Sequence, residues 1–85
     1  MAASKYRFET RAAIDRGLVL HTLLGNGQLD GDVIVALIPR SPRRTCRALR
    51  TLHYLSMVRP TPDGTAWEIT ERGREFAMAS AGAVA

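Results

Sequence analysis

The chain has 85 residues, with 12 lysines and arginines against 8 aspartates and glutamates, and a formal net charge of +4. This length allows one small domain with a single core, and we expect no separate effector-binding domain. Cys46 is the single cysteine, which excludes an internal disulfide and a zinc site built on paired cysteines.

The sequence contains no stretch as long and apolar as a membrane span, and its first residues lack an apolar run of signal-peptide length. We therefore expect a soluble, cytoplasmic protein. A basic excess of this kind points first to nucleic acid as a partner, and then to acidic lipids or acidic proteins.

Residues 1–9 are expected to form a flexible arm in which basic and aromatic side chains alternate, with a short strand as the alternative. A first helix is predicted from Glu9 or Thr10 to Leu24, because the run at residues 25–27, Gly-Asn-Gly, is typical of a helix end. Apolar residues cover most of this helix, which predicts burial on several sides.

Gln28 and Leu29 are long enough only for a minimal strand. Asp30 is the expected N-cap of a short second helix, residues 31–38. The six consecutive apolar residues in this segment could equally form a buried strand, because periodicity does not separate the two. The aspartate before the run and Pro39 after it favour the helix.

The third predicted helix, residues 42–55, is the most informative part of the chain. Ser41 followed by Pro42 is a strong helix start. Between Asp32 and Asp63 the chain has no acid but six arginines, and four of them fall in this helix. At about 100° per residue, one narrow stripe carries three arginines and a tyrosine, Arg43, Arg47, Arg50 and Tyr54. The opposite side is expected to be buried and carries Thr45, Ala48, Leu49, Leu52 and Leu55.

A hairpin is predicted over residues 58–69, because Asp63-Gly64 is a typical turn between two short strands. Thr70 is expected to cap a fourth helix, residues 71–79, and residues 80–85 form a C-terminal tail that could extend this helix or fray. The domain then spans residues 10–79. Its fold class is α+β, mainly α, with three helices, a two-stranded hairpin and a C-terminal helix.

This order of elements resembles the winged helix-turn-helix domain of small bacterial transcription regulators of the multidrug-resistance and arsenic-repressor type. The matching segment is residues 23–77, and it closes with Ile-Thr-Glu-Arg-Gly-Arg at residues 69–74, similar to the end of the hairpin in that family. In two departures, Pro39 replaces the usual glycine of the turn, and the second helix is unusually apolar. The resemblance implies that helix 42–55 enters the major groove and that hairpin 58–69 forms a wing beside it.

The resemblance and the chemistry of arginine together predict the DNA-binding residues. The guanidinium fork matches two acceptors on guanine, and residues near the start of a recognition helix usually reach bases while later ones meet phosphates. We expect base contacts from Arg43, Arg44 and Arg47. We expect contacts to the DNA backbone from Arg40, Arg50 and Arg59, with Thr61 and Thr65 at the tip of the wing.

The predicted function is sequence-specific binding of double-stranded DNA by a transcriptional regulator associated with the nucleoid. Apolar residues exceed what the core needs, which predicts a homodimer through Val33, Leu37 and the first helix. Two alternatives stay open. One is a winged-helix protein-interaction module in which the arginines are incidental, and the other is an RNA-binding or architectural DNA-binding protein of replication or a mobile element.

The sequence predicts no enzymatic activity, no cofactor and no metal site, because the carboxylates are scattered and no nucleophile or phosphate-cradling motif is present. Cys46 and His53 are a weak candidate pair for a metal, and Cys46 is a weak redox candidate. His21 could be a packed core histidine. We expect Trp67 to pack on the core and Tyr54 to cover a partner subunit.

Overall fold

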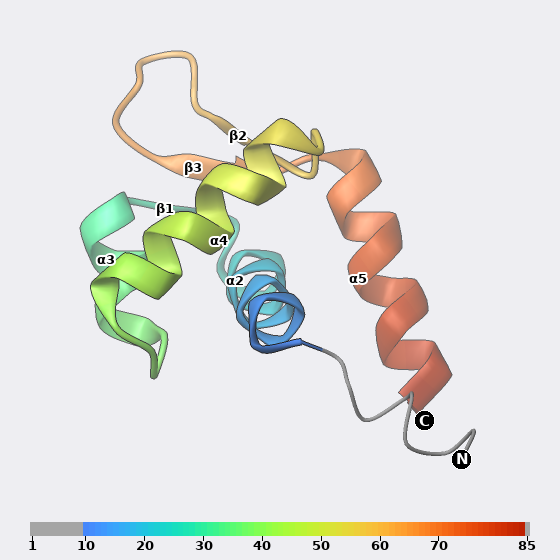
Figure 1. The fold of residues 1–85 in the computed structure, drawn as a ribbon. Coiled ribbons are helices and arrows are strands. Elements are labelled where there is room, and N and C mark those ends of the chain that lie inside the picture. Colours follow the sequence, from blue (N-terminus) through green and yellow to red (C-terminus); the bar gives the residue numbers. More distant parts are fainter. Residues whose placement is uncertain (1–9, 85) are drawn as a thin grey trace.

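A computed structural model describes residues 10–84 of the chain (Figure 1). The predicted arm, residues 1–9, lies outside the described residues. The elements are α2 (Arg11–Asn26), β1 (Gln28–Leu29), α3 (Gly31–Leu37), α4 (Pro42–Tyr54), β2 (Val58–Pro60), β3 (Trp67–Ile69) and α5 (Glu71–Val84). The domain is α+β and mainly helical, as predicted, and α5 extends through most of the segment that was assigned to the tail.

The described strands form a three-stranded antiparallel sheet in the order β1-β3-β2, where the sequence predicted a two-stranded hairpin. Within the hairpin, Arg59 lies opposite Glu68. On the other side of β3, Gln28 of β1 lies opposite the same Glu68, and Leu29 lies opposite Trp67. The minimal strand therefore ties the base of the hairpin to the connection between α2 and α3.

Helix α2 is the centre of the core. In Figure 1 it is seen end-on, between α4 on one side and α5 on the other, and it contacts both. Its residues Val19, Leu20 and Leu23 are at most 1% exposed. The predicted burial of this helix on several sides is confirmed. His21, however, is exposed and is not a core histidine.

Helix α4 buries the face that its sequence predicts, and the buried residues are Thr45, Ala48, Leu49 and Leu52. Leu55 is the exception: the helix ends at Tyr54, and Leu55 occupies the C-cap with 36% of its surface exposed. Burial of each leucine side chain stabilises the fold by about 1.5–3 kcal/mol. Turning the arginine face of α4 inward would forfeit this stabilisation, so the orientation of the helix is fixed.

Side-chain hydroxyls cap the starts of α2, α4 and α5. The Thr10 Oγ1 accepts the Ala13 N–H at 3.1 Å at the start of α2, and the Ser41 Oγ accepts the Arg44 N–H at 3.2 Å at the start of α4. Asp30 occupies the N-cap of α3 as predicted, although its side chain makes no capping hydrogen bond. Helix α3 therefore starts without side-chain help.

The first helix is longer than predicted, because Asn26 is still helical and only Gly27 ends α2. Gly27 has φ +83°, a left-handed conformation that glycine adopts without steric cost. Its N–H donates to the carbonyl oxygen of Leu23 at 2.8 Å. The chain then turns directly into β1.

The end of α4 is closed by a residue that is not glycine. Ser56 has φ +64°, and it lies one residue past the C-cap. Its N–H donates to the His53 carbonyl at 3.0 Å, and the Met57 N–H donates to the Leu52 carbonyl at 2.9 Å. This pair of bonds is the Schellman motif, whose left-handed position strongly favours glycine.

Ser56→Gly is expected to raise the free energy of unfolding by roughly 0.5–1 kcal/mol, because the strain of a left-handed serine exceeds the extra entropy that glycine gives the unfolded chain. Chemical denaturation of the two proteins measures the difference. Ser56→Ala keeps the strain and serves as the control. A glycine variant less stable than the parent protein would contradict this account of the turn.

The start of α5 packs very closely on Met57, the residue that precedes β2. The Thr70 N–H donates to the Met57 carbonyl at 3.0 Å. The Thr70 hydroxyl donates to the Ser56 carbonyl at 2.7 Å and accepts the Gly73 N–H at 3.0 Å, which confirms Thr70 as the cap of this helix. A Cβ on Gly73 would collide with the Met57 carbonyl and lie 2.9 Å from Cγ1 of Ile69. This position therefore excludes any side chain.

Candidate nucleic-acid interface

The outer face of α4 is a surface of exposed arginines. Arg43, Arg47 and Arg50 are all exposed, and we call them the basic stripe. Within residues 10–79, no carboxylate forms an ion pair with any of the three. Tyr54 continues the stripe at the end of the helix and is 86% exposed. The predicted separation of charged and buried faces on this helix is confirmed.

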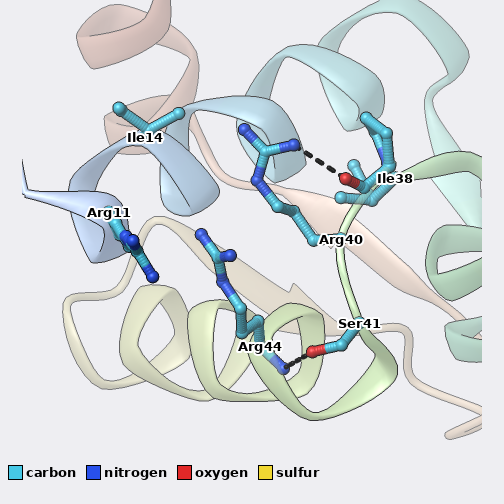
Figure 2. Close-up of a pocket in the computed structure, with 7 residues that line it drawn as sticks. Arg11, Ile14, Ile38, Arg40, Ser41 and Arg44 are labelled. Carbon is cyan, nitrogen blue, oxygen red and sulfur yellow. Dashed lines mark hydrogen bonds between the residues drawn. The ribbon is translucent and has the colours of Figure 1, made fainter.

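Arg44 does not belong to this stripe, because it turns toward α2. Its Nε donates to Oδ2 of Asp15 at 2.9 Å, and its Nη2 donates to Oδ1 at 2.8 Å. Arg40, in the connection between α3 and α4, donates from Nε to the same Oδ1 at 3.1 Å and from Nη1 to the Pro39 carbonyl at 2.7 Å. Figure 2 shows both arginine side chains reaching from α4 and its preceding loop toward α2.

Asp15 is therefore the residue that joins α2 to the start of α4. Its side chain is 6% exposed, whereas the side chains of Arg40 and Arg44 are 30% and 36% exposed. The hydrogen bond from Arg44 is the largest cause that holds the pKa of Asp15 below its ordinary value, and Arg40 adds to it against the opposing effect of burial. This role of Asp15 was not predicted, although Asp15 is the only acid in α2.

Arg59 of the hairpin was predicted to contact the DNA backbone, and in the structure it forms an ion pair with Glu68. Its Nε donates to Oε2 of Glu68 at 2.7 Å, across the hairpin register. The other carboxylate oxygen of Glu68 accepts from Nε2 of Gln28 at 3.1 Å. The Arg59 side chain is nevertheless 64% exposed, so the guanidinium lies at the surface with part of its charge neutralised by Glu68.

The predicted wing tip is held by its own side chains. One carboxylate oxygen of Asp63 accepts the Thr61 hydroxyl at 2.6 Å, the Thr65 N–H at 3.2 Å and the Thr65 hydroxyl at 3.0 Å. These bonds, that of Thr61 first, hold the pKa of Asp63 below its ordinary value. Thr61 is only 7% exposed and also accepts the Ala66 N–H at 3.2 Å. Its role is therefore structural, whereas Thr65 is exposed.

The remaining candidates lie on the flank of α4 that faces β3. The rings of His53 and Trp67 pack edge to face, with 5.4 Å between their centres. Trp67 packs on the core as expected, and Cys46 is exposed. Residues 10–79 contain no cluster of three His, Cys, Asp or Glu side chains placed to hold a metal ion. Over the same part of the chain, no helix has the length and apolarity to cross a membrane.

Neither the known protein families nor the curated proteins include a match to this chain. The predicted arginines of α4 and of the loop before it fall into two groups. Arg43, Arg47 and Arg50 face outward, while Arg40 and Arg44 are held against Asp15.

Proposed function

We propose that the protein binds double-stranded DNA, with α4 as a recognition helix in the major groove and the β2–β3 hairpin as a wing beside it. The observation that carries the proposal is the basic stripe, Arg43, Arg47 and Arg50, on a helix whose opposite face is buried. An α-helix with its side chains is about 10–12 Å wide, and the major groove of B-DNA is about 12 Å wide. Such a helix can lie in the groove without deforming the duplex.

The stripe gives each arginine a proposed role. Arg43 and Arg47 lie in the first half of α4 and are proposed to contact guanine, where each bidentate pair contributes roughly 1–3 kcal/mol of base discrimination. Arg50 lies further along and is proposed to contact phosphate. Arg44 is held by Asp15, so the base contact first expected from it is reassigned to the DNA backbone.

We further propose that the protein is a homodimer that associates with the nucleoid and regulates transcription. Val33 and Leu37 on α3 are 40% and 54% exposed. These apolar side chains support the predicted subunit contact. A two-fold dimer binds two half-sites whose centres are about one duplex turn apart, roughly 34–36 Å.

Selection of bound sequences from a random duplex pool tests the proposed function directly. We expect an enriched motif with two-fold symmetry. Binding to that duplex should weaken steeply with salt, because the logarithm of the binding constant falls by about 0.9 per phosphate contact for each logarithmic unit of salt. A flat salt profile with no enriched motif would favour the protein-interaction alternative, and stronger binding to RNA or single strands would favour the RNA-binding alternative.

Arg47→Ala is expected to weaken binding to the selected duplex by about tenfold or more, because one bidentate contact to a base is lost. Arg47 is exposed and forms no ion pair within residues 10–79, so the variant should keep the thermal stability of the parent. Arg74→Ala, an exposed arginine of α5, is the matched control and should bind normally. Equal affinities of the two variants would contradict the assignment of α4 to the groove. Fluorescence anisotropy provides the measurement.

A further inference from the structure

The cleft between α2 and α4 carries more positive charge than the fold requires. It has a volume of about 440 Å³, and its walls include Arg11 and Arg16 from α2 with Arg44 and Arg47 from α4. A neighbouring, more open pocket shares Arg11 and Arg44 and adds Arg40. Figure 2 shows the side chains of Arg11, Arg40 and Arg44 in the space between α2 and α4. We call these five residues the α2–α4 arginine cluster.

Among the described residues, one acidic side chain faces this cluster. Asp15 lines the cleft, and both of its carboxylate oxygens are used by Arg44 and Arg40. Arg11 and Arg16 form no ion pair with any acid within residues 10–79. Like charges on neighbouring helices repel one another and give the fold no stability in return. The arginines that line this cleft therefore form a surface that is complementary to an anion.

Asp15 also prepares Arg44 for a second ligand. The Nε and Nη2 atoms of Arg44 donate to the carboxylate, and among the hydrogen bonds of the described residues its Nη1 has no acceptor. A guanidinium that is already fixed in place loses little side-chain entropy when it binds another group. Arg44 can therefore hold Asp15 with one edge and present its remaining N–H donors to the cleft.

The first turn of α2 also favours an anion at this cleft. Its first position is Arg11, and its first turn contains no acid. Partial positive charge at a helix N-terminus favours acids there and disfavours cations. An anion placed between Arg11 and α4 would offset this unfavourable arrangement.

We propose that four residues of the α2–α4 arginine cluster, Arg11, Arg16, Arg40 and Arg44, bind a phosphate group, supplied by the DNA backbone at the edge of the groove that α4 occupies. This inference rests on the proposed function. Arg47 belongs both to the basic stripe and to the cleft, so the two surfaces are continuous. Guanidinium groups bind phosphate oxygens through paired, charge-assisted hydrogen bonds. The proposed DNA contact surface thereby extends to α2, beyond α4 and the β2–β3 hairpin.

The test is a double variant, Arg11→Gln with Arg16→Gln, in the full chain. Phosphate contacts carry no base information, so the preferred sequence should stay unchanged while affinity falls uniformly across duplexes. We expect about a tenfold loss at near-physiological salt, and the slope of binding against salt should fall in magnitude by roughly 2. The control is Arg72→Gln with Arg74→Gln on α5, which makes the same change in charge and should alter affinity less than about twofold.

The outcomes separate the two proposals. If the parent protein binds duplex DNA and the cleft variant matches the α5 control, the cluster is not a phosphate site and the proposed function stands. If the parent binds no duplex, the proposed function fails, and titration with inorganic phosphate decides the inference. Chemical-shift changes at the Arg11 and Arg44 side chains of the parent, with the change at Arg44 abolished in the double variant, would then assign the site to free phosphate. No change at either side chain would overturn it.

Discussion

Replacing Gly73 with alanine is expected to lower the free energy of unfolding by roughly 3 kcal/mol, at the upper end of overpacking effects. The added methyl would collide with the carbonyl of Met57 and lie 2.9 Å from Cγ1 of Ile69. The first of these groups is backbone, and that carbonyl also accepts the Thr70 N–H. Relief of the collision must therefore shift α5 away from Met57 and weaken a hydrogen bond at the start of that helix.

The higher helix propensity of alanine opposes this loss, so the sign of the change in the free energy of unfolding is informative. Alanine is the better helix former by about 1 kcal/mol, so an unobstructed glycine in a helix gains stability when it is replaced. Gly17, in the interior of α2, is such a case, because a Cβ there would meet no atom within 4 Å. We expect Gly17→Ala to raise the free energy of unfolding by about 0.5–1 kcal/mol. Urea denaturation of both variants measures the pair, and a stabilised Gly73→Ala would refute the close approach of α5 to Met57.

Replacing Asp15 with asparagine is expected to lower the free energy of unfolding by about 2 kcal/mol at about pH 7. The change keeps the size of the side chain and removes the charge that Arg40 and Arg44 share. Loss of a fully buried ion pair costs more, but about a third of each arginine side chain is exposed and water can solvate it after the change. Denaturant titration of the parent and the variant gives the difference.

The effect of this substitution should depend on pH in a defined direction. The pKa of Asp15 is lowered in the folded protein from its ordinary value of 3.8, so between the folded and unfolded values the unfolded chain binds more protons. The stability that Asp15 provides is therefore fully present above about pH 5 and is lost as the pH falls through its folded pKa. The parent and Asp15→Asn should then converge in stability.

Asp30→Asn supplies the matched control. Asp30 is exposed, and its side chain makes no capping hydrogen bond at the start of α3. Asparagine is about as good as aspartate at an N-cap. We expect this variant to follow the parent protein across the whole pH range. An Asp15→Asn variant that behaves like the control would show that the carboxylate does not hold α2 to α4.

Local sequence signals were sufficient to predict α4. Ser41 and Pro42 define its start through a hydroxyl cap and a proline at the first position, which are interactions within one turn. Its apolar residues recur at helical spacing, and all of those predicted on the buried face except Leu55 meet the core. The outward direction of Arg43, Arg47 and Arg50 follows from this burial alone, because a helix with one buried face must present the other to solvent.

The features that sequence reasoning missed depend on residues far apart in the chain. Arg43 and Arg44 are neighbours, yet a rotation of about 100° sends one to solvent and the other toward α2. Only the packing of α2 against α4 places Asp15 in reach of Arg44. Likewise, the pairing of β1 with β3 requires the fold to be complete before Gln28 and Glu68 meet. Periodicity and caps contain no information about such contacts.

The hydrogen bonds that Thr61 and Thr65 donate to Asp63 affect how the hairpin can bind a partner. Thr61 and Thr65 fix the loop before binding, so the cost of ordering it belongs to folding and not to association. A rigid tip of this kind adds affinity without an entropic penalty, but it also cannot adjust to a target of different contour. Recognition at this end of the molecule is therefore expected to discriminate by shape.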